Sequence, residues 1–244
     1  MHVMRARRHR AAAPGPARQR GLTLVELMVG IAVGLFIVAA AAMLVATQLN
    51  DNRRLLLETQ LQQDLRAAAE IITRELRRAG HWTLAERLVW TAAGPNENNP
   101  FAAVTPDEEA ATEAQFRYMR RPGEEGPFGF RLVTVGSGSA ARGVVQTLLA
   151  GGGWQDLTDS LVLDVTTFSV TPRHGPPLPI ACARLCADGS TDCWPTLTVR
   201  EFVVDIVARS VRDPLVERRL TTVVRLRNDL VDFRTGVANQ ACPG

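Results

Sequence analysis

The chain carries a long apolar run near its start and a periodic apolar pattern directly after it. Residues 27–46 are almost wholly apolar, and no charged residue lies between Leu27 and Asn50. About 20 apolar residues, at roughly 1.5 Å per residue, span a hydrocarbon core of about 30 Å. The run therefore predicts a helix that crosses a membrane once. Its arginine-rich flank would stay in the cytoplasm, and the following residues would be carried across.

Beyond Asn50 the chain becomes charged, but apolar residues recur every three or four positions, which places them on one face of a helix. Gly80 follows this stripe as a C-cap glycine would. We expect one helix over residues 22–79. Its part at 22–49 would form a transmembrane and assembly segment, and its amphipathic half at 50–79 would be covered by the chain's own globular domain. The stripe consists of Leu57, Leu61, Leu65, Ala68, Ile72, Leu76 and Ala79.

The remainder of the chain changes to short β-rich runs separated by segments rich in glycine or proline. One helix followed by many strands predicts an α+β fold, in which the long N-terminal helix packs on an antiparallel β-sheet. Residues 80–244 suffice for a single core and contain no internal repeat, so we expect one β-rich globular domain there. The predicted strand regions are 114–121, 130–135, 161–170, 197–211 and 220–226.

The charge of the chain is distributed unevenly. Its formal net charge is +3 and its pI is about 9.0, which invites a nucleic-acid interpretation. Residues 1–21, however, hold six arginines and no acidic residue, so 22 basic and 25 acidic residues remain beyond them. Aromatic residues make up 5% of the chain, which leaves little material for stacking on bases. Without residues 1–21 the chain is formally acidic, and nucleic acid is not an expected partner.

One carboxylate interrupts the apolar run. Glu26 would cost a few kcal/mol at membrane depth unless it is neutralised. If the basic leader is cut after Gly21, Leu22 acquires an α-amino group that can pair with Glu26 of another chain, so the carboxylate becomes tolerable in an assembly. An ordinary signal peptide fits less well, because the run exceeds an h-region of about 7 to 15 residues and no A-x-A site directly borders the polar stretch.

The run Gly21-Leu22-Thr23-Leu24-Val25-Glu26-Leu27 resembles the prepilin motif of type IV pilins and type II secretion pseudopilins. The resemblance implies that a prepilin peptidase removes the leader, residues 1–21, by cutting between Gly21 and Leu22. It also implies methylation of the new amino group on Leu22, with Glu26 as the assembly carboxylate. Most major pilins have Phe where this chain has Leu22, a difference that favours a minor pilin. A start at Met4 would shorten the leader.

Two further segments resemble the PilW family of minor pilins. One is the expected helix end, Leu76-Arg77-Arg78-Ala79-Gly80, and the other is the pair Arg227-Asn228 near the last predicted strand. Residues 100–195 carry no such resemblance. The implied function is a minor pilin that primes or supports assembly of the type IV pilus. The alternative is a J-type minor pseudopilin of type II secretion. A DNA-uptake competence pilin, with arginines such as Arg218 and Arg225, is a further alternative.

The resemblance also implies partners and a location. The partners are the prepilin peptidase, other minor and major pilins, and the inner-membrane platform of pilus assembly. The protein would cross the inner membrane once, with its leader in the cytoplasm and its globular domain in the periplasm. From there it would enter a pilus or a pseudopilus.

Four cysteines lie in the C-terminal third: Cys182, Cys186, Cys193 and Cys242. The C-x3-C and C-x6-C spacings, with no histidine after His174, do not match the usual zinc sites. Export favours disulfides instead. Four cysteines allow three pairings, and we expect one bond within the cluster and one from the cluster to Cys242.

The sequence contains no recognisable catalytic constellation. No serine or cysteine elbow lies near His81 or His174, and the acidic runs do not follow an EF-hand register. We therefore expect neither catalytic residues, nor a metal, nor a cofactor, and a membrane-anchored enzyme is disfavoured.

Overall fold

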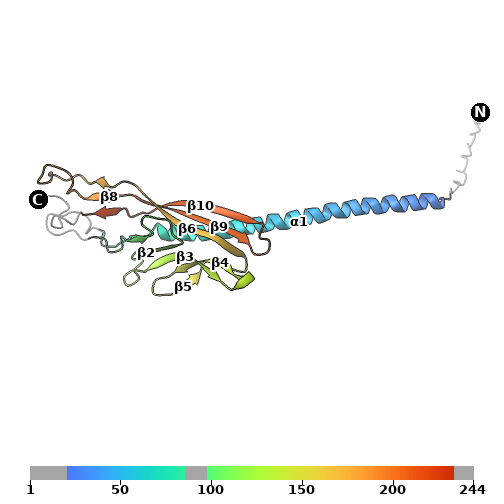
Figure 1. The fold of residues 1–244 in the computed structure, drawn as a ribbon, viewed down its shortest axis with the longest axis horizontal. Coiled ribbons are helices and arrows are strands. Elements are labelled where there is room, and N and C mark those ends of the chain that lie inside the picture. The colour runs from blue at the N-terminus through green and yellow to red at the C-terminus, as the bar shows by residue number, and fades with distance from the viewer. Residues whose placement is uncertain (1–20, 86–97, 234–244) are drawn as a thin grey trace, which may run out of the picture. The chain divides into compact units, whose positions relative to one another are not determined.

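The computed structural model describes residues 21–85 and 98–233. Its first element, helix α1, runs without interruption over Leu24–Leu76 (Figure 1). The chain divides into two compact units, residues 1–51 and 52–244. The first unit contains the apolar half of α1. The second unit contains the remainder of α1 and every described strand.

Helix α1 ends slightly earlier than its periodicity suggested. After Leu76 the backbone tightens into turns, in which the Arg78 amide donates to the Glu75 carbonyl at 3.0 Å and the Ala79 amide donates to the Leu76 carbonyl at 3.0 Å. Such i→i+3 bonds commonly close the last turn of a helix. Gly80 follows with a φ of 75°, a left-handed conformation that favours glycine.

The largest sheet in the described part of the chain has five antiparallel strands in sequential order. Consecutive strands pair with their neighbours, as expected where short loops join them. The strands are β1 (Val104–Thr105), β2 (Glu113–Phe116), β3 (Phe128–Val135), β4 (Arg142–Leu148) and β5 (Trp154–Asp156).

Two three-stranded antiparallel sheets complete the described fold. One has the order β10 (Glu217–Arg225), β9 (Arg200–Ser210), β6 (Leu163–His174), with a register shift between Val165 and Thr167. The other has the order β11 (Leu230–Asp232), β8 (Thr196–Thr198), β7 (Leu178–Pro179). A short 3-10 turn, η2 (Gly138–Ala140), precedes β4.

Most predicted strand regions contain strands, with differences at their ends. The runs 130–135 and 220–226 lie largely within β3 and β10, and most of 161–170 lies in β6. The run 197–211 is divided at Val199 between β8 and β9, and the alternating run from 114 is extended only to Phe116. Strands β1, β4, β5, β7 and β11 were not predicted. Four of them are only two or three residues long, whereas β4 has seven residues but lacks a regular alternation of buried and exposed positions.

The core of the second unit joins α1 to the five-stranded sheet and to the sheet of β10, β9 and β6. In Figure 1 the C-terminal part of α1 runs alongside β6 and β9. The predicted stripe is confirmed: Leu61, Leu65, Ile72 and Leu76 are at most 2% exposed, whereas Leu57 is half-buried. The predicted α+β fold, a long N-terminal helix on antiparallel sheet, is likewise what the structure has. Its buried strand partners include Phe116, Phe130, Phe168, Val170, Phe202, Val204 and Ile206.

Candidate functional site

The predicted cleavage position lies immediately before α1. Gly21 and Leu22 are exposed and have no regular secondary structure, and the helix begins two residues after Leu22. A Cβ added to Gly21 would meet no atom within 4 Å. The peptide bond between Gly21 and Leu22 is therefore open to an approaching enzyme, as a processing site must be.

Thr23 and Glu26 form a reciprocal cap at the start of α1. The Glu26 amide donates to Thr23 Oγ1 at 3.2 Å, and the Thr23 amide donates to Glu26 Oε2 at 3.1 Å. The Thr23 hydroxyl also donates to Oε2 at 3.0 Å. This is a capping box, which satisfies backbone donors that have no partner within the helix. We did not single out Thr23 in the sequence, although the Thr-x-x-Glu spacing before an apolar run is a local signal for this cap.

The two oxygens of the Glu26 carboxylate differ in their surroundings. Oε2 accepts both bonds from Thr23, whereas Oε1 accepts no hydrogen bond from the described residues. A cut between Gly21 and Leu22 would leave the whole capping box in the mature chain. The cap therefore holds the carboxylate by one oxygen and leaves the other available to an external donor.

The apolar half of α1 has no covering within its own unit. Every residue from Gly21 to Asn50 is exposed, including Phe36 at 77% and Leu24 at 74%. By length and composition this part of the helix can cross a membrane. Exposed apolar surface on this scale is typical of a segment whose environment is lipid or other subunits.

The other end of α1 is held by residues that are distant in sequence. Asn228 Nδ2 donates to the Ala79 carbonyl at 3.0 Å, and the Arg227 amide donates to the Arg77 carbonyl at 3.1 Å. The helix-end motif and the Arg-Asn pair, which we identified separately in the sequence, therefore contact each other. We call Gly80, Asn99, Arg200 and Asn228 the helix-end clasp.

Asn99 and Arg200 complete the clasp. Asn99 Nδ2 donates to the Gly80 carbonyl at 2.7 Å. The guanidinium of Arg200, a residue only 4% exposed, donates to the Asn228 carbonyl at 2.9 Å and also to the carbonyl of Ala102. A Cβ on Gly80 would lie 3.1 Å from Arg200 Nη2, a tight contact that adds to the preference for glycine set by φ. The clasp satisfies carbonyls that follow the last helical turn.

Burial of Arg200 has an electrostatic consequence. Loss of hydration lowers the pKa of the Arg200 guanidinium, and the carboxylates of Asp229 and Asp107 oppose that effect. Arginine nevertheless stays protonated at physiological pH. The clasp therefore contains a permanent buried cation that is bound largely by backbone carbonyls.

A carboxylate beside the clasp accepts hydrogen bonds from three side chains. Glu75 accepts hydrogen bonds from the Tyr118 hydroxyl at 2.5 Å and from Arg78 at 3.1 Å, and Arg120 lies 3.5 Å from it. Burial, followed by the bond to Glu75, raises the pKa of the Tyr118 hydroxyl. This network connects the last turn of α1 to the chain after β2.

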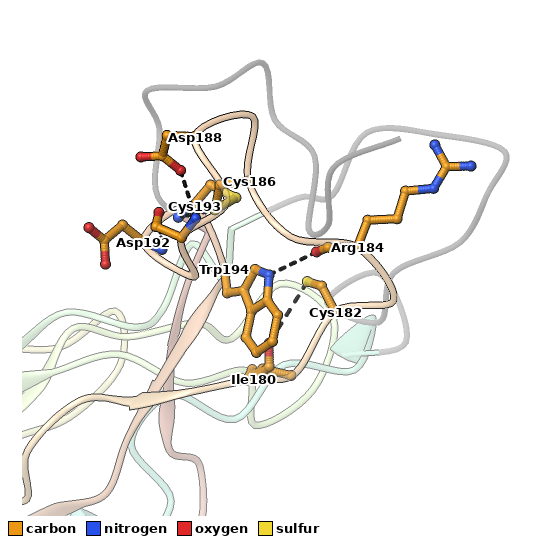
Figure 2. The surroundings of a disulfide bond; sticks show 9 residues. Ile180, Cys182, Arg184, Cys186, Asp188, Asp192, Cys193 and Trp194 are labelled. Carbon is orange, nitrogen blue, oxygen red and sulfur yellow. Dashed lines mark hydrogen bonds between the residues drawn. A yellow bond between two sulfur atoms is a disulfide. The ribbon is translucent and has the colours of Figure 1, made fainter.

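The cysteine cluster contains one of the two expected disulfides (Figure 2). Cys186 is bonded to Cys193 across a sequence separation of 7, so the disulfide within the cluster is confirmed. Cys182 is also disulfide-bonded. Cys242 lies outside the described residues, and its pairing stays a prediction. Trp194 Nε1 donates to the Arg184 carbonyl at 3.0 Å, a second link within the loop between β7 and β8.

Two family models match the chain. Residues 16–42, which include Gly21, Leu22 and Glu26, match the prokaryotic N-terminal methylation motif. Residues 54–226 match the family described as prepilin peptidase-dependent protein B. The chain belongs to the prepilin peptidase-dependent protein B family. It is thus a type IV pilin-like protein, and its α+β fold is a pilin-like fold. No curated protein and no solved structure matches it.

Membership in this family relates the basic N-terminal segment, the methylation motif and the exposed apolar half of α1 to one another. The family depends on prepilin peptidase, which accounts for a basic leader before a Gly-Leu bond and a methylation motif. Pilin-like families are structural proteins that assemble with other pilins. The exposed apolar half of α1 fits a membrane-anchored pilin. The match over 54–226 also covers residues 100–195, for which sequence inspection had found no resemblance.

Proposed function

We propose that this protein is a minor pilin of the PilW type, which primes or supports assembly of the type IV pilus. It is made in the inner membrane with its leader in the cytoplasm and its globular domain, from residue 80 onward, in the periplasm. Prepilin peptidase cuts between Gly21 and Leu22, and the new amino group of Leu22 is methylated. The assembly platform then transfers the protein into the filament among other minor and major pilins.

The observation that carries this proposal is the state of Glu26. Thr23 holds one carboxylate oxygen, while Oε1 has no hydrogen-bond donor among the described residues. A charged carboxylate in an apolar helix requires a partner when water is excluded. The methylated amino group of a neighbouring subunit is a cation of suitable size. An ion pair between it and Glu26 would compensate both charges within the bilayer. The capping box orients the carboxylate for that pairing.

The meeting of the two PilW-like motifs supports the finer assignment. Gly80 and Asn228 belong to motifs that are far apart in the sequence, yet both lie in one clasp at the end of α1. Each motif has a structural role in closing the helix end, which supports the PilW-type assignment.

Two substitutions and a deletion test the proposal. Gly21→Ala should leave the leader attached, which a mass shift of the membrane-bound protein would reveal. Glu26→Gln should be cut normally but enter filaments poorly, because an amide cannot pair with the amine as an anion. Glu70→Gln serves as the matched control, because Glu70 is an exposed carboxylate on the rear half of α1.

The deletion strain separates the proposal from its alternative. Loss of surface pili with intact protein secretion would support the minor-pilin role. Loss of secretion with intact pili would instead identify a J-type pseudopilin. Normal filament entry of Glu26→Gln would contradict the assembly role of the carboxylate.

A further inference from the structure

A basic cleft of about 530 Å³ lies at the C-terminal end of α1 in the second unit. We use the name basic cleft for this space and its lining. Three of its residues are arginines that come from the end of α1, the segment after β2 and the segment after β10. The lining residues are Arg78, His81, Tyr118, Met119, Arg120, Arg227 and Asn228.

The three arginines differ in how their charges are compensated. Arg78 pairs with Glu75 at 3.1 Å, and Arg120 pairs with Glu124 at 3.2 Å. The side chain of Arg227 has neither an ion pair nor a hydrogen bond to any residue that the structure describes. Since Glu124 is also bound by Arg121 at 2.6 Å, the cleft retains an excess of positive charge.

The backbone that carries the Arg227 side chain is held in place. The Arg227 amide donates to the Arg77 carbonyl, and the neighbouring Asn228 side chain donates to the Ala79 carbonyl. The helix-end clasp therefore presents the Arg227 side chain from a fixed backbone. A site on fixed backbone loses less conformational entropy on binding than one on a mobile loop.

The chemistry of the cleft favours carboxylates over nucleic acid. Arginine can bind carboxylates through paired N–H donors. Within the domain, Arg78 already donates a single hydrogen bond to Glu75, and Arg120 donates one to Glu124. Tyr118 cannot stack on a base, because it is 2% exposed and its ring centroid lies 4.2 Å from that of Phe128.

We propose that the basic cleft binds an acidic peptide segment of a neighbouring subunit, with Arg227 as the first anchor and Arg78 and Arg120 as further donors. That the segment belongs to a pilin rests on the proposed function, whereas carboxylate binding by the cleft does not. The contact would add a specific polar interaction between globular domains to the apolar contacts of the helices.

The first test measures binding by the mature full-length protein in detergent micelles. A fluorescein-labelled tetraglutamate peptide should bind saturably, and added salt should weaken the binding, as fluorescence anisotropy would report. Arg227→Gln should weaken it about tenfold, as expected for loss of one charge-assisted contact. Arg66→Gln removes the same charge from an exposed helix position outside the cleft and should change affinity less than twofold.

Three results would overturn the proposal. These are an absence of saturable binding by the unsubstituted protein, equal weakening by Arg66→Gln and Arg227→Gln, and a short DNA duplex that displaces the peptide at lower concentration than unlabelled tetraglutamate does. The last result would make the cleft a nucleic-acid site. Unchanged thermal unfolding of Arg227→Gln would exclude loss of folding as the cause of weaker binding.

The second test separates the cleft from the proposed function. In cells, Arg227→Glu should be processed normally but should form fewer surface pili than Arg66→Glu. If the deletion strain loses pili while Arg227→Glu restores them fully, the minor-pilin role stands and the assignment of the partner falls. If the deletion strain keeps its pili while the purified protein binds tetraglutamate through Arg227, the minor-pilin role falls and carboxylate binding by the cleft stands.

Discussion

The two halves of α1 are one continuous helix, but they meet different needs. Residues 24–50 are largely apolar and exposed on all sides, whereas the following half buries a single stripe in the core of the second unit. A stripe with a period near 3.6 needs a cover on one side, which the chain's own sheets supply. A helix that is apolar all round needs a cover on every side, which must come from lipid or other subunits. The rear half of α1 is therefore packed by the chain's own domain, whereas the front half depends on surroundings outside the chain.

The ends of α1 differ in the same way. The start is capped by Thr23 and Glu26, which are three residues apart. The region after the last turn is held by Asn99, Arg200 and Asn228, which come from distant parts of the chain. The first end can form in an isolated helix, and the second requires the folded domain.

The largest contrast is expected from matched truncations in the two halves. Ile72→Ala removes a side chain that is 0% exposed and should lower the free energy of unfolding by about 3 kcal/mol. Ile37→Ala, at a position 61% exposed, should leave the unfolding of the second unit unchanged. Thermal and denaturant unfolding in detergent would measure both. Equal losses would mean that the two halves share one cooperative core.

A smaller loss is expected at the clasp. Gly80→Ala forces a side chain into a φ of 75° and places a Cβ 3.1 Å from Arg200 Nη2, so unfolding should become easier by about 1 to 2 kcal/mol. Gly30→Ala in the apolar half is the control, because a Cβ there would meet nothing within 4 Å. Denaturant melts of the two variants give the comparison. A neutral Gly80→Ala would show that the clasp does not stabilise the folded domain.

A local effect is expected at the first helix end. Thr23→Val keeps the shape of the side chain but removes the hydroxyl of the capping box, which should weaken the first turn by about 1 kcal/mol. Faster hydrogen exchange of the amides at Glu26 and Leu27 in micelles would report it. The midpoint for unfolding of the second unit should not move, and a shift there would contradict the independence of the two regions.

The smallest effect concerns pH. Hydrogen bonds from Arg219 and Thr221 lower the pKa of the Asp205 carboxyl below its usual range, an effect that burial partly opposes. The ionised carboxylate therefore stabilises the folded state above the unfolded pKa of about 4, and this contribution is lost as the pH falls through the folded pKa.

Asp205→Asn should lower the unfolding temperature at pH 7 and flatten its decline below about pH 4. The change should be small, because the Arg219 side chain is 68% exposed to water. Asp232→Asn, at an exposed position, is the control for a simple change of charge. If Asp205→Asn kept the full acid sensitivity of the unsubstituted chain, the Asp205–Arg219 pair would not be its source.

Several features could be read from the chain alone because their causes are local. The apolar run, the stripe from Leu57 to Ala79 and the spacing from Gly21 to Glu26 are all patterns within one helix. The same holds for the Thr-x-x-Glu cap, whose two residues are three positions apart in the chain. Strands β4 and β5 could not be assigned with equal ease, since β5 has only three residues and β4 lacks a regular alternation of buried and exposed positions.

The sequence by itself determined the processing motif, the membrane-length segment and the class of fold, because charge, hydrophobicity and helical period act between near neighbours. Two other features were decided only by the tertiary structure. The meeting of Gly80 with Arg200 and Asn228, and the cleft formed by Arg78, Arg120 and Arg227, depend on strand order and register. Such contacts join residues far apart along the chain, and only the packing of α1 against the sheets brings them within hydrogen-bonding distance.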